Sequence, residues 1–238
     1  MISVEIPGDK VQGLFQRRVN RFIGEVFVEG NLETVHIANT GRMKELLVPG
    51  AAVILRRADF PHRKTKFDLL MVYRGSTLVS IDSKLPNQLL EKAFLKGVIP
   101  GYEGYTTVKR EVTFGKSRFD LSLLNPDTKK LALIEAKCVT LVKEDGLATF
   151  PDAPTLRGIK HVRELIDGLA AGHRGEVFFV VQRRDGSRFQ PNGVMDPGFL
   201  EAVAAAEEAG VKFRAYNCQV SPDKIELFEE IPVTIPRG

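Results

Sequence analysis

Residues 111–137 combine a strongly β-favouring sequence with ionic side chains, and this combination limits the possible folds more than any other part of the chain. The segments E-V-T-F-G-K-S-R-F-D-L-S-L-L and L-A-L-I-E-A-K flank a turn-forming N-P-D-T-K-K, which predicts two adjacent antiparallel strands. Asp120 falls inside the first strand. Glu135 and Lys137 are two residues apart in the second, so we expect their side chains on one face of the sheet.

Charges on a mostly apolar sheet must be paired, hydrated or bound to a metal, because burying them alone costs several kcal/mol. Converging carboxylates suit Mg²⁺ or Mn²⁺, and a neighbouring lysine could hold a water molecule and offset charge on a phosphate. This is the arrangement of the PD-(D/E)xK nuclease core, with Asp120 as the first acid and Glu135-Ala136-Lys137 as the E-x-K. The alternative is a solvated hairpin whose charges only form salt bridges.

The composition indicates an ordinary globular protein that can bind nucleic acid but need not. Of 238 residues, 43% are hydrophobic and 27% charged, and the net charge is +4. Cys138 and Cys218 lie in apolar runs and are expected as buried thiols rather than a disulfide or a zinc site. Neither a signal peptide nor an apolar run of about 20 residues is visible, which predicts a cytoplasmic protein without a membrane partner.

Between residues 14 and 82 the pattern is one of short strands. Turn signals at Gly30-Asn31 and Gly75-Ser76 favour a small antiparallel barrel of the oligonucleotide-binding (OB) type. A short helix is expected from Arg42, ended by Pro49-Gly50. The barrel would occupy residues 1–82 and a second domain residues 83–238. Phe22 or Phe60 could stack on bases, and the basic residues that could follow a phosphate backbone are Arg17, Arg18, Arg21, Arg42, Lys44, Arg63, Lys64 and Lys66. A solvated basic face explains them equally well.

The second half alternates helices with apolar strands. Helices are predicted from Pro86 to Gly97 and from Thr155, which can cap its helix, to Gly172. The continuous apolar run E-V-F-F-V-V-Q-R indicates a buried parallel strand, with Gln182 near its C-terminal end, where binding sites collect. A further helix and strand follow. The order matches the αβββαβ core that the ionic triad requires. The helical positions of Arg157, Lys160 and His161 predict a stripe that is either solvated surface or part of a nucleic-acid contact.

Several ordered blocks resemble the sugar fermentation stimulation protein family (SfsA). They include R-V-N-R-F-I-G at 18–24, H-I-A-N-T-G-R-M-K-E-L-L-V-P-G at 36–50, P-N-Q-L at 86–89 and R-E-V-T-F-G-K-S-R-F-D at 110–120. Others are E-A-K-C-V-T-L at 135–141, where the family more often has E-V-K-S-V-T-L, and F-P-D-A-P-T-L-R-G-I-K-H at 150–161. The resemblance implies an N-terminal OB-like barrel, a C-terminal PD-(D/E)xK restriction-endonuclease-like domain, and non-specific DNA binding.

Two functions from different classes follow. The first is a Mg²⁺- or Mn²⁺-dependent nuclease of DNA or RNA, in which Asp120, Glu135 and the Ala136 carbonyl hold the metal and Lys137 orients water. Glu111 or Glu91 would support a second ion, Gln182 and Arg118 would position phosphate, and a homodimer is left open. The second is a non-enzymatic, non-specific DNA-binding regulator of sugar (maltose) metabolism genes, a role for which no helix-turn-helix or zinc finger is visible.

Overall fold

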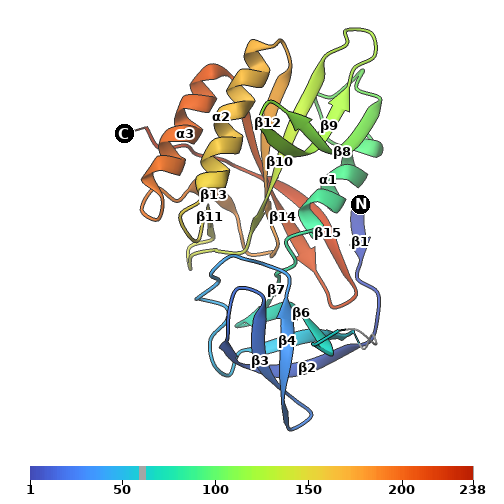
Figure 1. Cartoon of the computed structure of the whole chain (residues 1–238), viewed down its shortest axis with the longest axis vertical. Helices are drawn as coiled ribbons and strands as arrows, with labels where there is room; N and C mark the ends of the chain where they lie inside the picture. Colours follow the sequence, from blue (N-terminus) through green and yellow to red (C-terminus); the bar gives the residue numbers. More distant parts are fainter. Residues whose placement is uncertain (59–62, 238) are drawn as a thin grey trace.

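The computed structural model describes residues 1–58 and 63–237, so Phe60, expected as a stacking residue, lies outside the described part of the chain. Two β-structures are stacked along the long axis of the molecule (Figure 1). A six-stranded sheet lies at one end, and a seven-stranded sheet carrying all three helices of the described residues lies at the other. Within the described residues, no helix is both long and apolar enough to cross a membrane.

The six-stranded sheet closes into the predicted OB-like barrel. Its strand order is β4-β3-β2-β5-β6-β7, and a parallel pairing of β4 with β6 joins Val35 to Phe67 and Ile37 to Leu69. Phe15, Val26 and Leu55 are among the side chains buried in its interior. The strands are β2 (Lys10–Arg18), β3 (Ile23–Val28), β4 (Asn31–Ile37), β5 (Ala52–Arg57), β6 (Phe67–Arg74) and β7 (Thr77–Ser80).

The predicted hairpin turn near Gly30 is present in the barrel. Val28 pairs with Asn31, so Glu29 and Gly30 form a two-residue loop, with φ angles of 51° and 83°. Positive φ at both positions matches the strand twist of a tight hairpin, and glycine adopts it without strain.

The helix expected from Arg42 is wrong. Residues 42–47 form a single turn in which the N–H groups of Leu46 and Leu47 both donate to the Met43 carbonyl. Met43 has a positive φ of 46°, its N–H donates to Asp152 Oδ2 at 2.9 Å, and its side chain is fully buried in the barrel. A tertiary hydrogen bond and core burial at Met43 therefore override the helical propensity of this segment.

Arg63, expected to contact phosphate, instead forms an ion pair with Asp68 of the barrel strand β6. Arg63 and Arg56 donate to the buried Asp68 carboxylate at 2.5 and 2.7 Å. Burial alone would raise the pKa of Asp68, but hydrogen bonds from Arg63 and Arg56 outweigh it and lower that pKa to about 2. The guanidinium groups of Arg56 and Arg63 therefore stabilise the barrel through Asp68.

Asp68→Asn is expected to lower the free energy of unfolding at neutral pH by about 2 kcal/mol, the equivalent of a pKa lowered from 3.8 to about 2. The folded-state pKa is depressed, so this stability is present above pH 4 or so and is lost as the pH falls toward about 2. Urea unfolding at a series of pH values should show a steeper acid loss for the wild type than for Asp68→Asn. Parallel pH profiles for the two proteins would contradict the assignment.

The seven-stranded sheet has the order β1-β15-β14-β12-β10-β9-β8, with β10, β12 and β14 parallel at its centre. In sequence its core runs α1, β8, β9, β10, α2, β12, which is the predicted restriction-endonuclease-like αβββαβ order. The helices are α1 (Leu85–Leu95), α2 (Leu156–Ala170) and α3 (Pro197–Ala209). The strands are β1 (Ile2–Glu5), β8 (Thr107–Phe114), β9 (Ser117–Leu124), β10 (Leu131–Val139), β12 (Arg174–Val181), β14 (Lys212–Val220) and β15 (Lys224–Ile231). A separate parallel pair joins β11 (Leu147–Phe150) to β13 (Arg188–Pro191).

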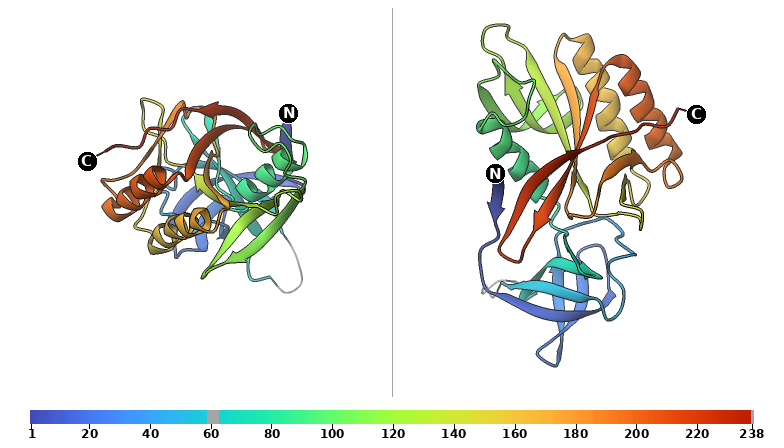
Figure 2. Two further views of the ribbon diagram at one scale, coloured as in Figure 1. Left: turned by 90° about the horizontal axis from the view of Figure 1, so that it is seen from above. Right: turned by 180° about the vertical axis from the view of Figure 1, so that it is seen from behind.

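Helices cover both faces of this sheet. Ile134 of β10 and Phe178 of β12 pack in one core with α1, whereas Leu133 and Phe179, their neighbours in sequence, pack in a second core with α2 and α3. Figure 2 shows α1 apart from the α2–α3 pair. Successive strand residues point to opposite faces, so a continuous apolar strand must be covered twice. The predicted buried strand at 176–183 is confirmed as β12.

Two details of the sheet differ from the expectations. The segment before Asn125, expected as one strand, is the hairpin β8–β9, which turns at Gly115 with a φ of 57°. In addition, β1 pairs with β15, with Ile2 opposite Leu227, so residues 2–5 join the seven-stranded sheet rather than the barrel (Figure 2). The chain thus starts on this sheet, forms the barrel, and returns through α1.

Candidate functional site

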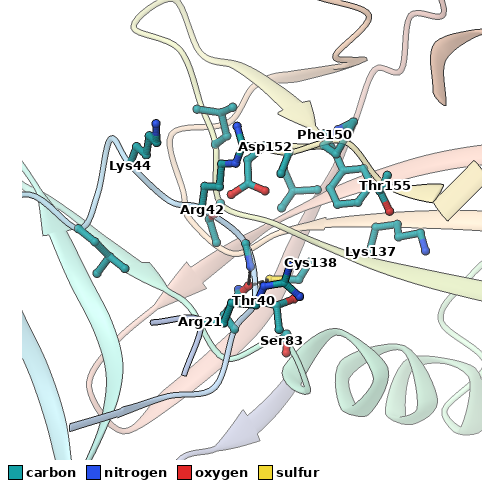
Figure 3. A pocket seen from close by; sticks show the side chains of 18 of the residues that line it. Arg21, Thr40, Arg42, Lys44, Ser83, Lys137, Cys138, Phe150, Asp152 and Thr155 are labelled. Atoms are coloured by element: carbon teal, nitrogen blue, oxygen red, sulfur yellow. Dashed lines mark hydrogen bonds between the residues drawn. The ribbon is translucent and has the colours of Figure 1, made fainter. Parts of the chain in front are cut away.

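A cleft of about 1210 Å³ lies between the barrel and the seven-stranded sheet. Arg21, Thr40 and Arg42 line it from the barrel side, and Lys137 and Thr155 line it from the sheet side (Figure 3). Asp120, Glu135 and Ala136 also line it. The structure therefore brings the predicted acids and the E-x-K lysine together with barrel cations in one cavity.

Asp120 lies where two strands separate. Pairing of β9 with β10 runs from Leu131–Leu124 to Ile134–Leu121 and then stops. Beyond this point the Asp120 side chain replaces the backbone hydrogen bond between the two strands, because its Oδ2 accepts the Ala136 N–H at 2.9 Å. Its Oδ1 accepts a hydrogen bond of 2.7 Å from Asn87 of α1. The opening between β9 and β10 thus exposes a carboxylate with a fixed orientation.

Glu135 and Lys137 share one face of β10, as the sequence predicted. Lys137 Nζ lies 2.5 Å from Glu135 Oε1, and Nδ1 of His161 lies 2.6 Å from the same oxygen. Glu135 is only 4% exposed. Burial would raise its pKa, but the charge of Lys137 and the hydrogen bond from His161 outweigh burial and lower it, so Glu135 is ionised.

The pKa of Asp120 moves in the opposite direction. It is raised first by burial and then by the nearby charge of Glu135, which the hydrogen bonds from Ala136 and Asn87 offset only in part. Two neighbouring carboxylates whose pKa values are pushed apart are typical of sites where a cation or a proton is held between them.

The donor set fits a hard divalent cation. Glu135 Oε2 is buried and has no hydrogen-bond partner among the described residues, although its other oxygen has two. No group of three His, Cys, Asp or Glu side chains that could hold a metal occurs in residues 1–58 and 63–237. Mg²⁺ is commonly held by one or two carboxylates, with water completing the shell, so Asp120, Glu135 and the Ala136 carbonyl form a sufficient protein contribution.

Glu111 and Glu91, expected to support a second ion, are engaged elsewhere. Glu111 Oε2 lies 2.6 Å from Arg118 Nε in an ion pair, and Glu91 Oε2 lies 3.7 Å from Arg110 Nη1. Neither glutamate lines the cleft. Arg118, expected to position phosphate, is consequently also committed to an ion pair outside the cleft.

Gln182 anchors the barrel and does not line the cleft. Its side chain is fully buried, and Nε2 donates to the carbonyls of Ser80 and Asp82 at 3.1 Å each and to Cys138 Sγ at 3.1 Å. These contacts join the end of β12 to the segment that leaves the barrel. The sequence placed Gln182 correctly at a strand end but could not show which partners it meets there. Cys138 itself is a free thiol, and burial raises its pKa to about 12.

The predicted nucleic-acid contacts divide into two groups. Arg21, Arg42 and Arg157 line the cleft, as does Lys44. Three others do not face the cleft in this way: His161 is buried with its Nδ1 against Glu135, Lys160 donates to the Lys116 carbonyl, and Lys64 does not line the cleft.

Arg18 also lines the cleft, but its guanidinium group is used by the fold. It donates to the carbonyls of Asn20, Arg21, Asn39 and Arg42 at 3.1, 2.7, 2.7 and 3.0 Å, and also to that of Gly41. Burial lowers its pKa, partly offset by the charge of Asp152. Arg18 thus holds residues 39–42 against the 19–22 turn.

The loop at residues 39–43 is also attached to the segment that follows β11. Asp152, next to β11, accepts the Met43 N–H, and a Cβ added to Gly41 would lie 2.9 Å from Asp152 Oδ2. A side chain at position 41 would therefore require the Asp152 carboxylate to shift. Asn87 and Asp152 were not identified as site residues by the sequence analysis. Their only signals were the P-N-Q-L and F-P-D-A-P-T blocks.

Comparisons with known proteins agree with this architecture. The family model described as the sugar fermentation stimulation protein RE domain matches residues 84–224, and the SfsA N-terminal OB domain matches residues 17–81. The sugar fermentation stimulation protein homolog of Alkaliphilus metalliredigens is 58% identical over 232 residues, covering 98% of this chain and 100% of the relative. The homolog of Alkaliphilus oremlandii is 44% identical over 226 residues, covering 94% and 96%.

A solved structure shows the same fold. Pyrococcus furiosus SfsA, determined in complex with Ca²⁺, aligns with a TM-score of 0.87 at 32% identity and covers 98% of each chain. The resemblance inferred from the sequence blocks is confirmed over nearly the full length. The chain belongs to the sugar fermentation stimulation protein family.

Proposed function

We propose that this protein is a nuclease that hydrolyses phosphodiester bonds with the help of Mg²⁺ or Mn²⁺. The observation that carries the proposal is the buried Glu135 carboxylate, one oxygen of which has no partner among the described residues, in a cleft that also contains Asp120 and Lys137. A carboxylate oxygen buried in this way costs free energy unless a hydrogen-bond donor or a cation binds it, and a cation would be shared with Asp120.

Asp120, Glu135 and the Ala136 carbonyl would hold the cation. When bound, the cation would act as a Lewis acid on a phosphate oxygen and stabilise the charge that develops there. The Pyrococcus furiosus relative was determined in complex with Ca²⁺, a hard cation that prefers oxygen ligands, and this supports a cation site in the present chain. Glu91 and Glu111 are left out of this set because their carboxylates pair with arginines outside the cleft.

The remaining side chains have separate roles in the proposal. Lys137 is placed to donate a hydrogen bond to the attacking water and to offset negative charge in the transition state. Arg21, Arg42, Lys44 and Arg157 line the cleft and would bind the phosphate backbone. Backbone contacts of this kind carry no base information, so the substrate is nucleic acid without sequence preference. In this proposal residues 1–82 would supply Arg21, Arg42 and Lys44 for strand binding, and residues 83–238 would supply the hydrolytic residues together with Arg157.

The test is a cleavage assay on single-stranded DNA, duplex DNA and RNA with Mg²⁺, with Mn²⁺ and with EDTA. We expect cleavage of at least one polymer with either metal and none in EDTA. Binding measured in EDTA should weaken steeply with salt, because cations in the cleft release counterions from phosphate. Salt-dependent binding without cleavage under any of these conditions would overturn the nuclease. It would favour the non-enzymatic regulator of sugar metabolism genes instead.

A further inference from the structure

His161 is a buried polar residue for which the proposed reaction has no direct use. It lies on α2, is 4% exposed, and its Nδ1 is 2.6 Å from Glu135 Oε1. The Phe119 ring packs beside it, with 5.9 Å between ring centroids. A residue enclosed in this way cannot contact nucleic acid, which overturns its expected role on a binding surface.

The hydrogen bonds of His161 define its tautomer. Arg157, one helical turn earlier, donates from Nε to His161 Nε2 at 3.4 Å. A guanidinium group can only donate, so Nε2 must accept and carries no proton. The ring proton therefore lies on Nδ1 and is donated to Glu135. The result is a directed chain of hydrogen bonds from Arg157 through His161 to Glu135.

We propose that His161 is a positioning residue that fixes the Glu135 carboxylate for cation binding and that Arg157 sets its tautomer. This inference rests on the cation site of the proposed function. Lys137 and His161 both bind Oε1, so the carboxylate is held with Oε2 as its open ligand atom. Without His161 only Lys137 would hold the carboxylate, which could then rotate. Partners that orient a metal-binding side chain commonly change metal affinity by about 10- to 100-fold.

Arg157 has a second role that can be separated from the first. Its Nε donates a hydrogen bond to His161. The side chain is exposed and lines the cleft, so its two terminal nitrogens can bind phosphate. Arg157→Lys keeps the positive charge but lacks the Nε donor. This variant should retain the salt dependence of nucleic-acid binding and lose part of the cation affinity.

The test measures Mn²⁺ binding by calorimetry on the full-length protein without nucleic acid. His161→Leu is expected to weaken Mn²⁺ binding by at least about tenfold. His161→Asn, whose amide N–H can take the place of Nδ1–H, should recover most of the affinity. His173 is the matched control, because it accepts the Leu131 N–H at the opposite end of β10. His173→Leu should bind Mn²⁺ as tightly as the wild type.

Thermal unfolding of each variant shows that the protein assayed is folded. Wild-type Mn²⁺ affinity in folded His161→Leu would overturn the inference, as would equal losses in His161→Leu and His161→Asn. This result is distinguishable from failure of the proposed function. If Mn²⁺ binds with the expected ranking of variants but no polymer is cleaved, the positioning role stands and the nuclease does not.

Discussion

Asp120→Asn is expected to reduce metal-dependent cleavage by about 1000-fold or more, equivalent to about 4 kcal/mol of transition-state stabilisation. The substitution removes one of the two carboxylates available for the cation. It also removes an acceptor, because an amide has one oxygen whereas Asp120 accepts from both Ala136 and Asn87. Single-turnover rates with saturating Mg²⁺ measure the loss, and anisotropy with labelled DNA in EDTA should show unchanged or slightly tighter binding.

Asp127→Asn is the control for this substitution. Asp127 is exposed in the turn between β9 and β10, at the other end of the strands that carry Asp120 and Glu135. The Asp127→Asn variant removes one negative charge, as Asp120→Asn does, but far from the cleft. We therefore expect it to cleave at the wild-type rate. Wild-type cleavage by folded Asp120→Asn would show that this carboxylate is not part of a catalytic cation site.

Arg18→Met should destabilise the protein by about 3 kcal/mol or more, although Arg18 lines the cleft and sequence analysis assigned it to nucleic acid. The variant leaves a set of backbone carbonyls in the 19–22 turn and the 39–42 loop without their donor. Hydrogen bonds to a charged group contribute about 1.5 to 3 kcal/mol each, and the orphaned acceptors add a desolvation penalty. The urea midpoint measures the loss.

Arg42→Met is the matched comparison. Arg42 is exposed, lines the same cleft, and has no side-chain hydrogen bond to any described residue. Its removal should leave the urea midpoint unchanged, weaken binding to all polymers alike, and lower the salt-dependence slope by about one. The reverse pattern, a stable Arg18→Met with a reduced salt slope, would show that Arg18 binds phosphate after all.

The sequence predicted the elements that depend on local patterns. The apolar run at 176–183 indicated a strand covered on both faces, and Thr155 indicated the start of α2, where its side chain does accept the Gly158 N–H. The E-x-K spacing placed Glu135 and Lys137 on one face of β10, where the two side chains meet. These inferences succeeded because strand alternation and helix capping act over a few residues.

Local pattern failed where a distant partner decides the outcome. Residues 42–47 have helical propensity, but the bond from Met43 to Asp152 joins positions more than 100 residues apart in sequence. Nothing in the sequence around Met43 shows that this contact exists. Gly115 is a different case, because Phe114 pairs with Ser117 across a two-residue turn, which is a local signal that the sequence analysis did not use.

The sequence by itself determined the two β-structures, the αβββαβ order, and the placement of Glu135 and Lys137 on one face of a strand. Only the tertiary structure decided what each charged side chain does. Of the predicted cations, Arg21, Arg42 and Arg157 line the cleft, as does Arg18, but the guanidinium groups of Arg18 and Arg63 bind groups of the fold itself. The physical reason is that a charge must be paired or solvated, and the partner that satisfies it is chosen by three-dimensional proximity, which residue type and spacing do not encode.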